Sequence, residues 1–274
     1  MSNSKQTPEI VALILLFLGI TVMTIVGFAS RSWMPEVASE HGVGVDGVIH
    51  YLLISTGTVL VIGTLAMVWF LWRYGRGKPT ESPKTSVRTE RWWTLVPVLG
   101  MALIAEAGVF VKGLPVWEQV YGEAPADALV IEVTAQQFEW IVRYPGDDGE
   151  FGRVDPHLVH QTANPAGIDR SDPVAQDDIV VRNQVHIPVG RTIFLRLRSR
   201  DVLHSFSVAA FRVKQDIVPG IIGSTKFVAT RPGEYEIACA ELCGMGHYRM
   251  RGTVVVHAAD DYQSWIHSQP GWLQ

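Results

Sequence analysis

Three long apolar stretches dominate the first half of the chain. They cover residues 10–29, 48–72 and 92–111, and Glu106 is the carboxylate that interrupts the last of them. A helix needs about 20 apolar residues to cross the hydrocarbon core of a bilayer. Each stretch is therefore predicted to span the membrane, within an anchor that covers residues 1–120. An ionisable group such as Glu106 inside a span is a candidate functional residue, although the sequence does not identify its partner.

The first stretch has an alternative interpretation as a secretory signal peptide. Lys5 precedes it, and the small residues Ala29 and Ser30 stand at its end, as at a cleavage site. However, its uncharged run is longer than the roughly 7–15 apolar residues of a signal peptide, and its leader is hardly basic. We favour a retained span, and both interpretations leave the later topology unchanged.

Charges in the loops between the stretches predict how the chain is oriented. The loop after the second stretch is basic, whereas the loop after the first is mainly acidic. The former carries Arg73, Arg76, Lys78, Lys84, Arg88 and Arg91 against Glu81 and Glu90; the latter carries Glu36, Glu40 and Asp46 against Arg31. Basic loops stay in the cytoplasm. The chain after about residue 120 is therefore expected on the outer side of the membrane.

Beyond residue 120 the pattern changes to short runs rich in β-branched and aromatic residues. The predicted strands are residues 129–134, 138–144, 179–187, 192–198, 225–230, 234–239 and 252–257. Many short strands separated by Gly, Pro and Asp favour an antiparallel sandwich or barrel over residues 121–260. The polar stretch 145–178 predicts a long surface loop. A short helix over 260–268 is expected to lead into the C-terminal tail, residues 261–274.

The amino-acid composition limits the classes of function that this chain can have. A hydrophobic content of 47% with 18% charged residues favours one soluble domain joined to membrane spans. The net charge of -4, and the lack of a cluster of basic and aromatic residues in the second half, argue against nucleic-acid binding. Two cysteines and no C-x-x-C-H motif exclude both a disulfide framework and a covalently attached haem.

The segment CAELCGMGHYRM has the strongest chemical signal in the sequence. It places Cys239, Cys243, His247 and Met250 at spacings of four, four and three residues, and His204 lies 35 residues before Cys239. Thiolates, imidazoles and a thioether suit copper, and a blue-copper site would use only one cysteine. Two bridging thiolates would let two copper ions share one electron, with one imidazole on each ion. The sequence therefore predicts a two-copper centre suited to electron transfer.

Zinc and a disulfide are the alternatives for this cluster. Zinc sites favour four strong ligands and have little use for the thioether of Met250. A disulfide is the default for a cysteine pair outside the cytoplasm, but it would not require histidine and methionine at metal-ligand spacing. Both alternatives fit the segment less well than copper does.

From about residue 48 to residue 257 the chain resembles subunit II of haem–copper oxidases, the family with the two-copper site called CuA. The resemblance rests on five separated motifs in family order. They are ERWWTLVP (90–97), QQFEW (136–140), DVLHSFSV (201–208), FRVKQDIVPG (211–220) and CAELCGMGHYRM (239–250). It implies N-terminal membrane helices followed by a cupredoxin-like Greek-key β-barrel. The expected location is the bacterial inner membrane, with the copper domain on the periplasmic side.

The resemblance also implies roles for particular residues. The copper ligands would be His204, Cys239, Cys243, His247, Met250 and the backbone carbonyl of Glu241. The side chain of Glu241 matches a residue that approaches a magnesium ion at the interface with subunit I. Glu90 matches the carboxylate at the entrance of the proton path named K, where a group at the membrane surface can take up protons. The alternative for Glu90 is a solvated glutamate paired with a nearby arginine.

The QQFEW motif departs from the family pattern in one position. Phe138 stands where many members have the tryptophan that receives electrons from cytochrome c, whereas the second tryptophan is retained as Trp140. Phenylalanine offers a π surface but no indole N–H. Electrons are expected to arrive through Phe138 or Trp140, unless Trp140 is a core aromatic residue of its strand.

The long loop begins with an acidic run, Asp147, Asp148 and Glu150. This run would steer a basic cytochrome c by raising the encounter rate, or it is only a solvated turn. Together with the loop up to residue 178, it resembles subunit II of bacterial oxidases associated with alternative complex III. The donor is therefore expected to be cytochrome c or a cytochrome c domain of that complex.

We expect an electron-transfer subunit of a respiratory terminal oxidase, with no active site and no haem of its own. It would pass electrons from cytochrome c to haem in subunit I, where oxygen is reduced to water. Its other expected partners are further oxidase subunits and the lipid bilayer. A nitric oxide reductase of the same superfamily is the first alternative, because the chemistry of the gas lies in the partner. A free-standing membrane-anchored copper carrier or chaperone is the alternative of another class, which the proton-path motif and the spans disfavour.

Overall fold

The computed structural model describes residues 8–30, 33–75 and 85–271. The chain divides into two compact units, and each is described by itself. The first unit comprises residues 1–35 and 46–114, and the second comprises residues 36–45 and 115–274. Six charged residues used in the sequence predictions lie outside the described residues: Lys5, Arg31, Arg76, Lys78, Glu81 and Lys84.

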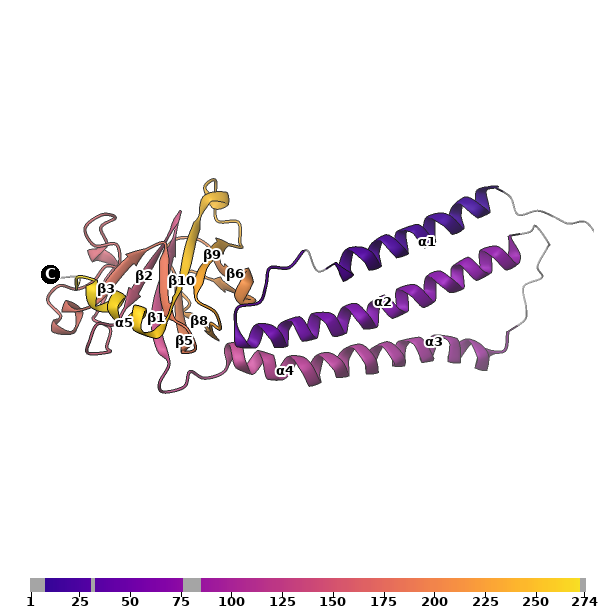
Figure 1. Ribbon diagram of the computed structural model, residues 1–274, viewed down its shortest axis with the longest axis horizontal. Helices are drawn as coiled ribbons and strands as arrows, with labels where there is room; N and C mark the ends of the chain where they lie inside the picture. The colour runs from indigo at the N-terminus through magenta and orange to yellow at the C-terminus, as the bar shows by residue number, and fades with distance from the viewer. Residues whose placement is uncertain (1–7, 31–32, 76–84, 272–274) are drawn as a thin grey trace, which may run out of the picture. The chain divides into compact units, whose positions relative to one another are not determined.

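The first half of the chain forms three long helices (Figure 1). They are α1 (Pro8–Ala29), α2 (Glu40–Tyr74) and a continuous helix made of α3 (Val87–Met101), η1 (Ala102–Glu106) and α4 (Ala107–Tyr121). Each helix is long and apolar enough to cross a membrane, and each encloses one of the predicted spans. The predicted pattern of three apolar helices is therefore confirmed in length and composition.

One turn of the third helix, η1, is π-helical and ends at Glu106. The hydroxyl of Tyr51 in α2 donates a hydrogen bond to the carbonyl of Ile104 within this turn. Gly108, one turn further on, lies against the ring of Tyr51, where a larger side chain would collide with it. The carboxylate inside the span therefore belongs to a local irregularity of a kind that is frequent at functional sites.

The second unit is built on two five-stranded sheets. Figure 1 labels most of their strands. The strands are β1 (Leu129–Gln136), β2 (Glu139–Tyr144), β3 (Ile179–Arg182), β4 (Gln184–Pro188), β5 (Thr192–Ser199), β6 (His204–Val208), β7 (Val213–Ile217), β8 (Gly223–Val228), β9 (Gly233–Cys239) and β10 (Arg251–His257). One sheet has the order β3-β2-β1-β5-β8, and the other has the order β4-β10-β9-β6-β7. Buried apolar side chains of both sheets form one core. The predicted class, N-terminal helices followed by an all-β domain, is confirmed.

Two strand pairings differ from the antiparallel arrangement that the sequence predicts. β1 pairs with β5 in parallel, and β4 pairs with β10 in parallel. The alternation of side chains along a strand indicates which residues face the core. It does not indicate which strand becomes the neighbour or in which direction that neighbour runs, so the mixed sheets were not predictable from it.

The predicted strand 179–187 is wrong as a single element, because Asn183 divides it between the two sheets. Asn183 has a φ of 58°, a left-handed conformation that asparagine tolerates better than most residues. Its backbone N–H donates to the carbonyl of Trp140 at 2.8 Å, and its side-chain oxygen accepts from the N–H of Trp140 at 2.9 Å. Its carbonyl accepts from the N–H of Thr253 at 2.8 Å. Strands β6 and β7 also went unpredicted.

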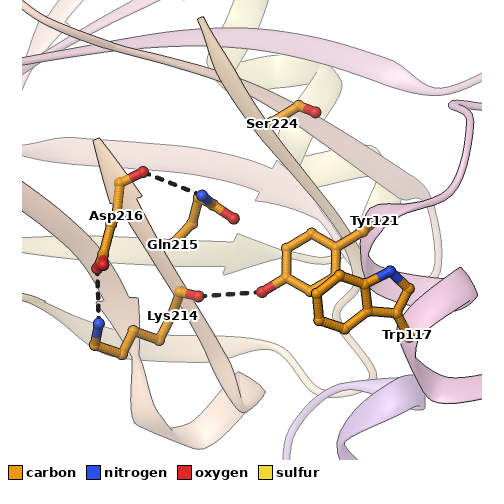
Figure 2. A pocket seen from close by; sticks show the side chains of 6 residues that line it. All are labelled: Trp117, Tyr121, Lys214, Gln215, Asp216 and Ser224. Carbon is orange, nitrogen blue, oxygen red and sulfur yellow. Dashed lines mark hydrogen bonds and ion pairs between the residues drawn. The ribbon is translucent and has the colours of Figure 1, made fainter. Parts of the chain in front are cut away.

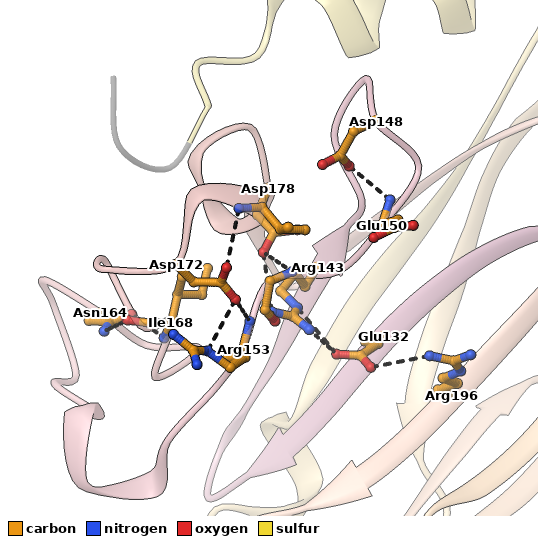
Figure 3. A network of polar contacts seen from close by, with 12 residues as sticks. Glu132, Arg143, Asp148, Glu150, Arg153, Asn164, Ile168, Asp172, Asp178 and Arg196 are labelled. Carbon is orange, nitrogen blue, oxygen red and sulfur yellow. Dashed lines mark hydrogen bonds and ion pairs between the residues drawn. The ribbon is translucent and has the colours of Figure 1, made fainter.

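The long loop between β2 and β3, residues 145–178, is anchored to the sheet by buried charges (Figure 3). Arg143 of β2 lies between Glu132 at 2.7 Å and Asp178 at 3.2 Å, and it also donates to the carbonyl of Gly152 at 2.8 Å. The ring of Phe151 lies 4.7 Å below the guanidinium group. These contacts fix both ends of the loop against β2.

The loop has internal structure of its own. It contains two short 3-10 turns, η2 (Pro156–Leu158) and η3 (Pro173–Gln176). The side chain of Asn164 bonds to the N–H and the carbonyl of Ile168, and Ile168 is fully buried. The predicted surface excursion is present as an ordered element. The predicted terminal helix is also present, as α5 (Ala259–Ser268).

Candidate metal centre

The predicted ligands come from two neighbouring strands and the loop that follows one of them. His204 is the first residue of β6, and Cys239 is the last residue of β9. These strands are antiparallel neighbours, with Phe206 opposite Cys239. This pairing places His204 next to Cys239, although the two residues are 35 positions apart in the sequence. The loop from Cys239 to Met250 then supplies the remaining candidates before β10 begins.

The sulfur and nitrogen atoms of these residues converge at one point. The two Sγ atoms of Cys239 and Cys243 are 3.7 Å apart. The Nδ1 atom of His204 lies 3.9 Å from Sγ of Cys239, and Nδ1 of His247 lies 3.7 Å from Sγ of Cys243. The Sδ atom of Met250 lies 3.7 Å from Sγ of Cys243. Within the described residues, the ligand atoms of His204, Cys239 and Cys243 all lie within 4.8 Å of one another.

The backbone of Glu241 is also part of the cluster. Its carbonyl oxygen accepts a hydrogen bond from the Cys239 thiol at 3.2 Å. A carbonyl in this position can serve as a weak ligand beside the cysteine sulfur. The sequence pattern alone could not locate it, because every residue has a carbonyl.

The ligand cluster is buried, and burial sets the protonation of its thiols. Cys239 is 8% exposed, Cys243 is 3% exposed and Met250 is 1% exposed. Burial, with Cys239 alongside, raises the pKa of the Cys243 thiol to about 11. Without a cation the thiol is therefore protonated at neutral pH. A metal ion that binds here must displace that proton.

The donor set fits copper. The cysteines are free, and a separation of 3.7 Å exceeds the S–S bond of a disulfide, which is about 2.05 Å. It lies within the reach of two metal–sulfur bonds of about 2.3 Å each, so both thiolates can contact the same ion. Two thiols, two imidazoles, a thioether and a carbonyl are more donors than one tetrahedral ion needs. Soft sulfur donors with imidazole favour copper over the hard cations.

Two residues that the sequence prediction did not include hold these ligands in place. Asp201 accepts a hydrogen bond from Nε2 of His204 at 2.8 Å, so that Nδ1 faces the sulfur atoms. The other oxygen of Asp201 accepts from the N–H of Gln137 at 2.7 Å. The side chain of Gln137 donates to the carbonyl of Cys243 at 2.7 Å. The turn between β1 and β2 therefore connects the His204 side of the cluster to the Cys243 side.

The two aromatic residues of the QQFEW motif lie at different depths beside the cluster. Phe138 is half-buried, and its ring lies against Gly244 and Gly246 of the ligand loop. A Cβ atom on Gly246 would lie 2.5 Å from this ring, and Gly244 has a φ of 130°, so both positions favour glycine. Trp140 is fully buried, and its ring centroid lies 6.4 Å from that of His204.

The remaining predicted site residues are not part of the ligand cluster. The acidic run Asp147, Asp148 and Glu150 follows the far end of β2, about 17 Å along the strand from its copper-side end. Its members are exposed, and Asp148 binds the N–H of Glu150 (Figure 3). Glu90 belongs to the first unit. It is exposed at the start of α3, where Thr85 donates to its carboxylate at 2.8 Å.

The FRVKQDIVPG motif lines an open pocket of the second unit (Figure 2). Lys214 and Asp216 of β7 form an ion pair at 2.7 Å. The hydroxyl of Tyr121, at the end of α4, donates to the carbonyl of Lys214 at 3.4 Å. Trp117 lies beside Tyr121, with ring centroids 4.4 Å apart. The last turns of α4 therefore pack on the strand that follows the His204 strand.

Comparisons with known proteins agree on one family. The family model described as "Cytochrome C oxidase subunit II, periplasmic domain" matches residues 129–259. The "Alternative cytochrome c oxidase subunit 2" of Bradyrhizobium diazoefficiens is 36% identical over 94% of this chain and 91% of that relative. "Cytochrome c oxidase subunit 2" of Cereibacter sphaeroides is 29% identical over 81% of this chain and 74% of that relative. The crystal structure of the periplasmic domain of subunit II of cytochrome oxidase of Bradyrhizobium japonicum matches with 29% identity and a TM-score of 0.39, over 53% of this chain and 96% of that one.

Proposed function

The chain belongs to the cytochrome c oxidase subunit II family, and from this premise we propose that its sulfur-rich cluster receives electrons from cytochrome c and passes them to haem in subunit I. Membership makes it an electron-transfer subunit of an oxidase complex. It also implies a membrane protein with a periplasmic domain. The observation that supports the proposal most strongly is the buried convergence of Cys239, Cys243 and His204, whose ligand atoms lie within 4.8 Å of one another.

The proposed ligands divide between two copper ions. The thiolates of Cys239 and Cys243 would be shared by the ions, and His204 and His247 would supply one imidazole to each. Met250 and the carbonyl of Glu241 are the weak ligands. When bound, the copper pair supplies one-electron redox chemistry. The side chain of Glu241 is proposed to approach a magnesium ion at the interface with subunit I.

The protein holds the proposed ligands in fixed positions and shields them from water. Asp201 fixes the orientation of the His204 ring, and Gln137 holds the Cys243 carbonyl. Such supporting contacts orient metal ligands and tune the metal. Because the ligands are buried, little solvent reorganises when an electron arrives. A centre that changes little between its two oxidation states suits a relay.

The proposed path for electrons begins at Phe138. Its half-buried ring lies directly on the ligand loop at Gly244 and Gly246. Trp140 is a core residue beside His204. It either packs against the proposed ligands or is a second step for electrons that arrive at Phe138. The exposed acidic run Asp147, Asp148 and Glu150 is proposed to steer the donor at long range.

Two further proposals concern the membrane unit. Glu90, exposed at the start of α3, is proposed to take up protons for the path in subunit I. The bacterial inner membrane is the proposed location, with the cluster on the periplasmic side, because the basic loop after α2 favours a cytoplasmic position.

The function is tested with Cys243→Ser in the purified oxidase. Serine lacks the thiolate, so the two-copper centre cannot form. We expect oxidation of reduced cytochrome c to fall to the level of copper-free enzyme. Oxygen consumption driven by a small reductant that acts directly on the haems should persist. Unchanged cytochrome c oxidation in the variant would show that electrons do not pass through this cluster.

A further inference from the structure

The second unit contains a pair of histidines outside the ligand cluster. His186 lies in β4, and His257 ends β10, the strand that pairs with β4 in parallel. Their sequence neighbours Val185, Ile187 and Val256 are core residues. Because side chains alternate along a strand, both histidines lie on the face of this sheet that points away from the core.

Helix α5 covers the histidine pair through an aromatic stack. The ring of Trp265 lies over that of His186, with centroids 4.0 Å apart and planes 6° apart, and it also stacks on His257 at 6.0 Å. Trp265 and Ile266 pack against the core, and Tyr262 of the same helix is 3% exposed. Helix α5 is therefore docked on the sheet at the histidine pair.

The two imidazole rings share one hydrogen bond. Nδ1 of His186 lies 2.8 Å from Nε2 of His257, and Nε2 of His186 lies 3.2 Å from the side-chain oxygen of Gln184. One N–H fits between the two rings, and a second fits between His186 and Gln184. Two protonated rings would instead place two N–H groups against each other. The geometry therefore accommodates a neutral or singly protonated pair and opposes a doubly protonated one.

The surroundings of the pair also oppose its protonation. Burial lowers the pKa of His186 to about 4, and the charge of His257 acts in the same direction. Burial also lowers the pKa of His257, against the attraction of Asp261 in α5. The face of Trp265 favours a single cation over it. The other titratable groups around the pair are Tyr144 of β2, Tyr262 of α5 and Arg191 just before β5.

We propose that His186, His257 and Trp265 form an acid-sensitive latch, which holds α5 on the sheet while the pair carries at most one proton and releases it when both rings are protonated. Release exposes the apolar sides of Trp265 and Ile266. It also loosens the end of the long loop, because Gly271 after α5 lies against the carbonyl of Gln176. The latch operates independently of the ligand cluster.

The direction of the pH effect follows from proton binding. Histidines released into water bind protons near pH 6.5, whereas the docked His186 binds one only near pH 4. Opening therefore takes up protons between these values and becomes more favourable as the pH falls. Between pH 7 and pH 4.5 the equilibrium constant for opening should rise roughly a hundredfold. Asp178, with its raised pKa, stabilises the folded domain as the pH falls, so the measurement must be local to α5.

Hydrogen–deuterium exchange of the purified oxidase measures the opening of α5. Protection of the α5 amides is followed by mass spectrometry at pH 7 and pH 4.5, and it is corrected for the intrinsic exchange rate at each pH. His186→Gln replaces the buried titrating ring by a planar amide that can still bond to His257. His267→Gln, which changes an exposed histidine of the same helix, is the matched control. The amides of β1 report whether the whole domain unfolds.

We expect α5 of the wild type and of His267→Gln to lose protection about a hundredfold between the two pH values, while β1 stays protected. In His186→Gln the loss should be no more than about tenfold, whatever its protection at pH 7. Equal protection of wild-type α5 at both pH values would overturn the inference, and this result does not depend on any variant. So would a loss in His186→Gln as large as that in the wild type, or a loss in α5 that occurs only together with β1.

Discussion

At the scale of single residues, the orientation of the proposed ligands depends on side chains outside the proposed ligand set. Asp201 accepts from Nε2 of His204, which leaves Nδ1 facing Cys239. Gln137 reaches the carbonyl of Cys243 and, through its own N–H, the carboxylate of Asp201. Free cysteine and histidine side chains have several rotamers, and these contacts select the one in which the donors converge.

Met250 is the proposed weak ligand, and its loss should change the reduction potential and not the metal content. Replacing it by leucine keeps the volume of a side chain that is 1% exposed, but it removes the sulfur atom 3.7 Å from Sγ of Cys243. The thioether donates electron density that favours the oxidised state, so Met250→Leu should raise the reduction potential. The expected shift is on the order of 59 mV, a tenfold change in a one-electron equilibrium.

Redox titration of the copper absorption measures this shift, with copper content per chain as the control. A variant that holds two copper ions at the wild-type potential would show that Met250 is a packing residue only.

The residues that converge in the cluster were identifiable from sequence, but the residues that position them were not. Four of these side chains are spaced four, four and three residues apart in one segment, and the fifth, His204, lies in a recognisable motif. Gln137 is separated by 64 residues from Asp201 and by 106 residues from Cys243. Glutamine and aspartate are common in turns, so only the folded structure identifies these two as partners of the site.

At the scale of elements, the long loop between β2 and β3 is fixed by a buried charge network (Figure 3). Arg143 and Asp178 form its centre, and Asp178 is fully buried. Removing one member of such a group leaves an uncompensated charge, which is more costly than losing an exposed pair. The sequence predicted a long loop from its polar residues and prolines, but not that it is ordered, because the network joins residues from β1, β2 and the loop.

The network predicts a pH dependence of stability. Burial raises the pKa of Asp178 to about 6, although Arg143 acts in the opposite direction. A carboxyl with a raised pKa in the folded state adds stability that is complete below its unfolded pKa, 3.8, and is lost as the pH rises through about 6. The loss amounts to roughly 3 kcal/mol. Asparagine at this position does not titrate.

We therefore expect the unfolding temperature of the wild type to fall relative to that of Asp178→Asn between pH 4 and pH 7. Thermal unfolding of the outer domain, followed by circular dichroism at each pH, measures the difference. A constant difference across this range would mean that Asp178 stays ionised in the folded state.

At the scale of the whole molecule, the three apolar stretches of the sequence coincide with the three long helices of the structure. The apolar stretches predicted these helices well because the requirement is local: enough apolar residues in a row. The boundary between the units was less predictable. Residues 36–45 belong to the second unit, although they lie between the first two helices in sequence. Hydrogen bonds such as that from the N–H of Ala38 to the carbonyl of Ala210 explain this assignment.

The proposed proton uptake belongs to this scale, because it serves a partner subunit. Glu90→Gln removes the titratable group at the start of α3 and retains an amide that can still contact Thr85. We expect oxygen consumption of the oxidase to slow severalfold, with the copper spectrum unchanged. Arg88→Gln, a neighbouring exposed charge on the same helix, is the matched control. Equal rates in the two variants would make Glu90 an ordinary surface charge.

The proposed function requires this chain to hold two copper ions that share one electron. Metal analysis combined with electron paramagnetic resonance on the purified protein tests it most directly. We expect two copper ions per chain and a seven-line hyperfine pattern from one unpaired electron shared equally between them. Zinc in the site, or a Cys239–Cys243 disulfide without metal in the native complex, would contradict it and leave a structural subunit.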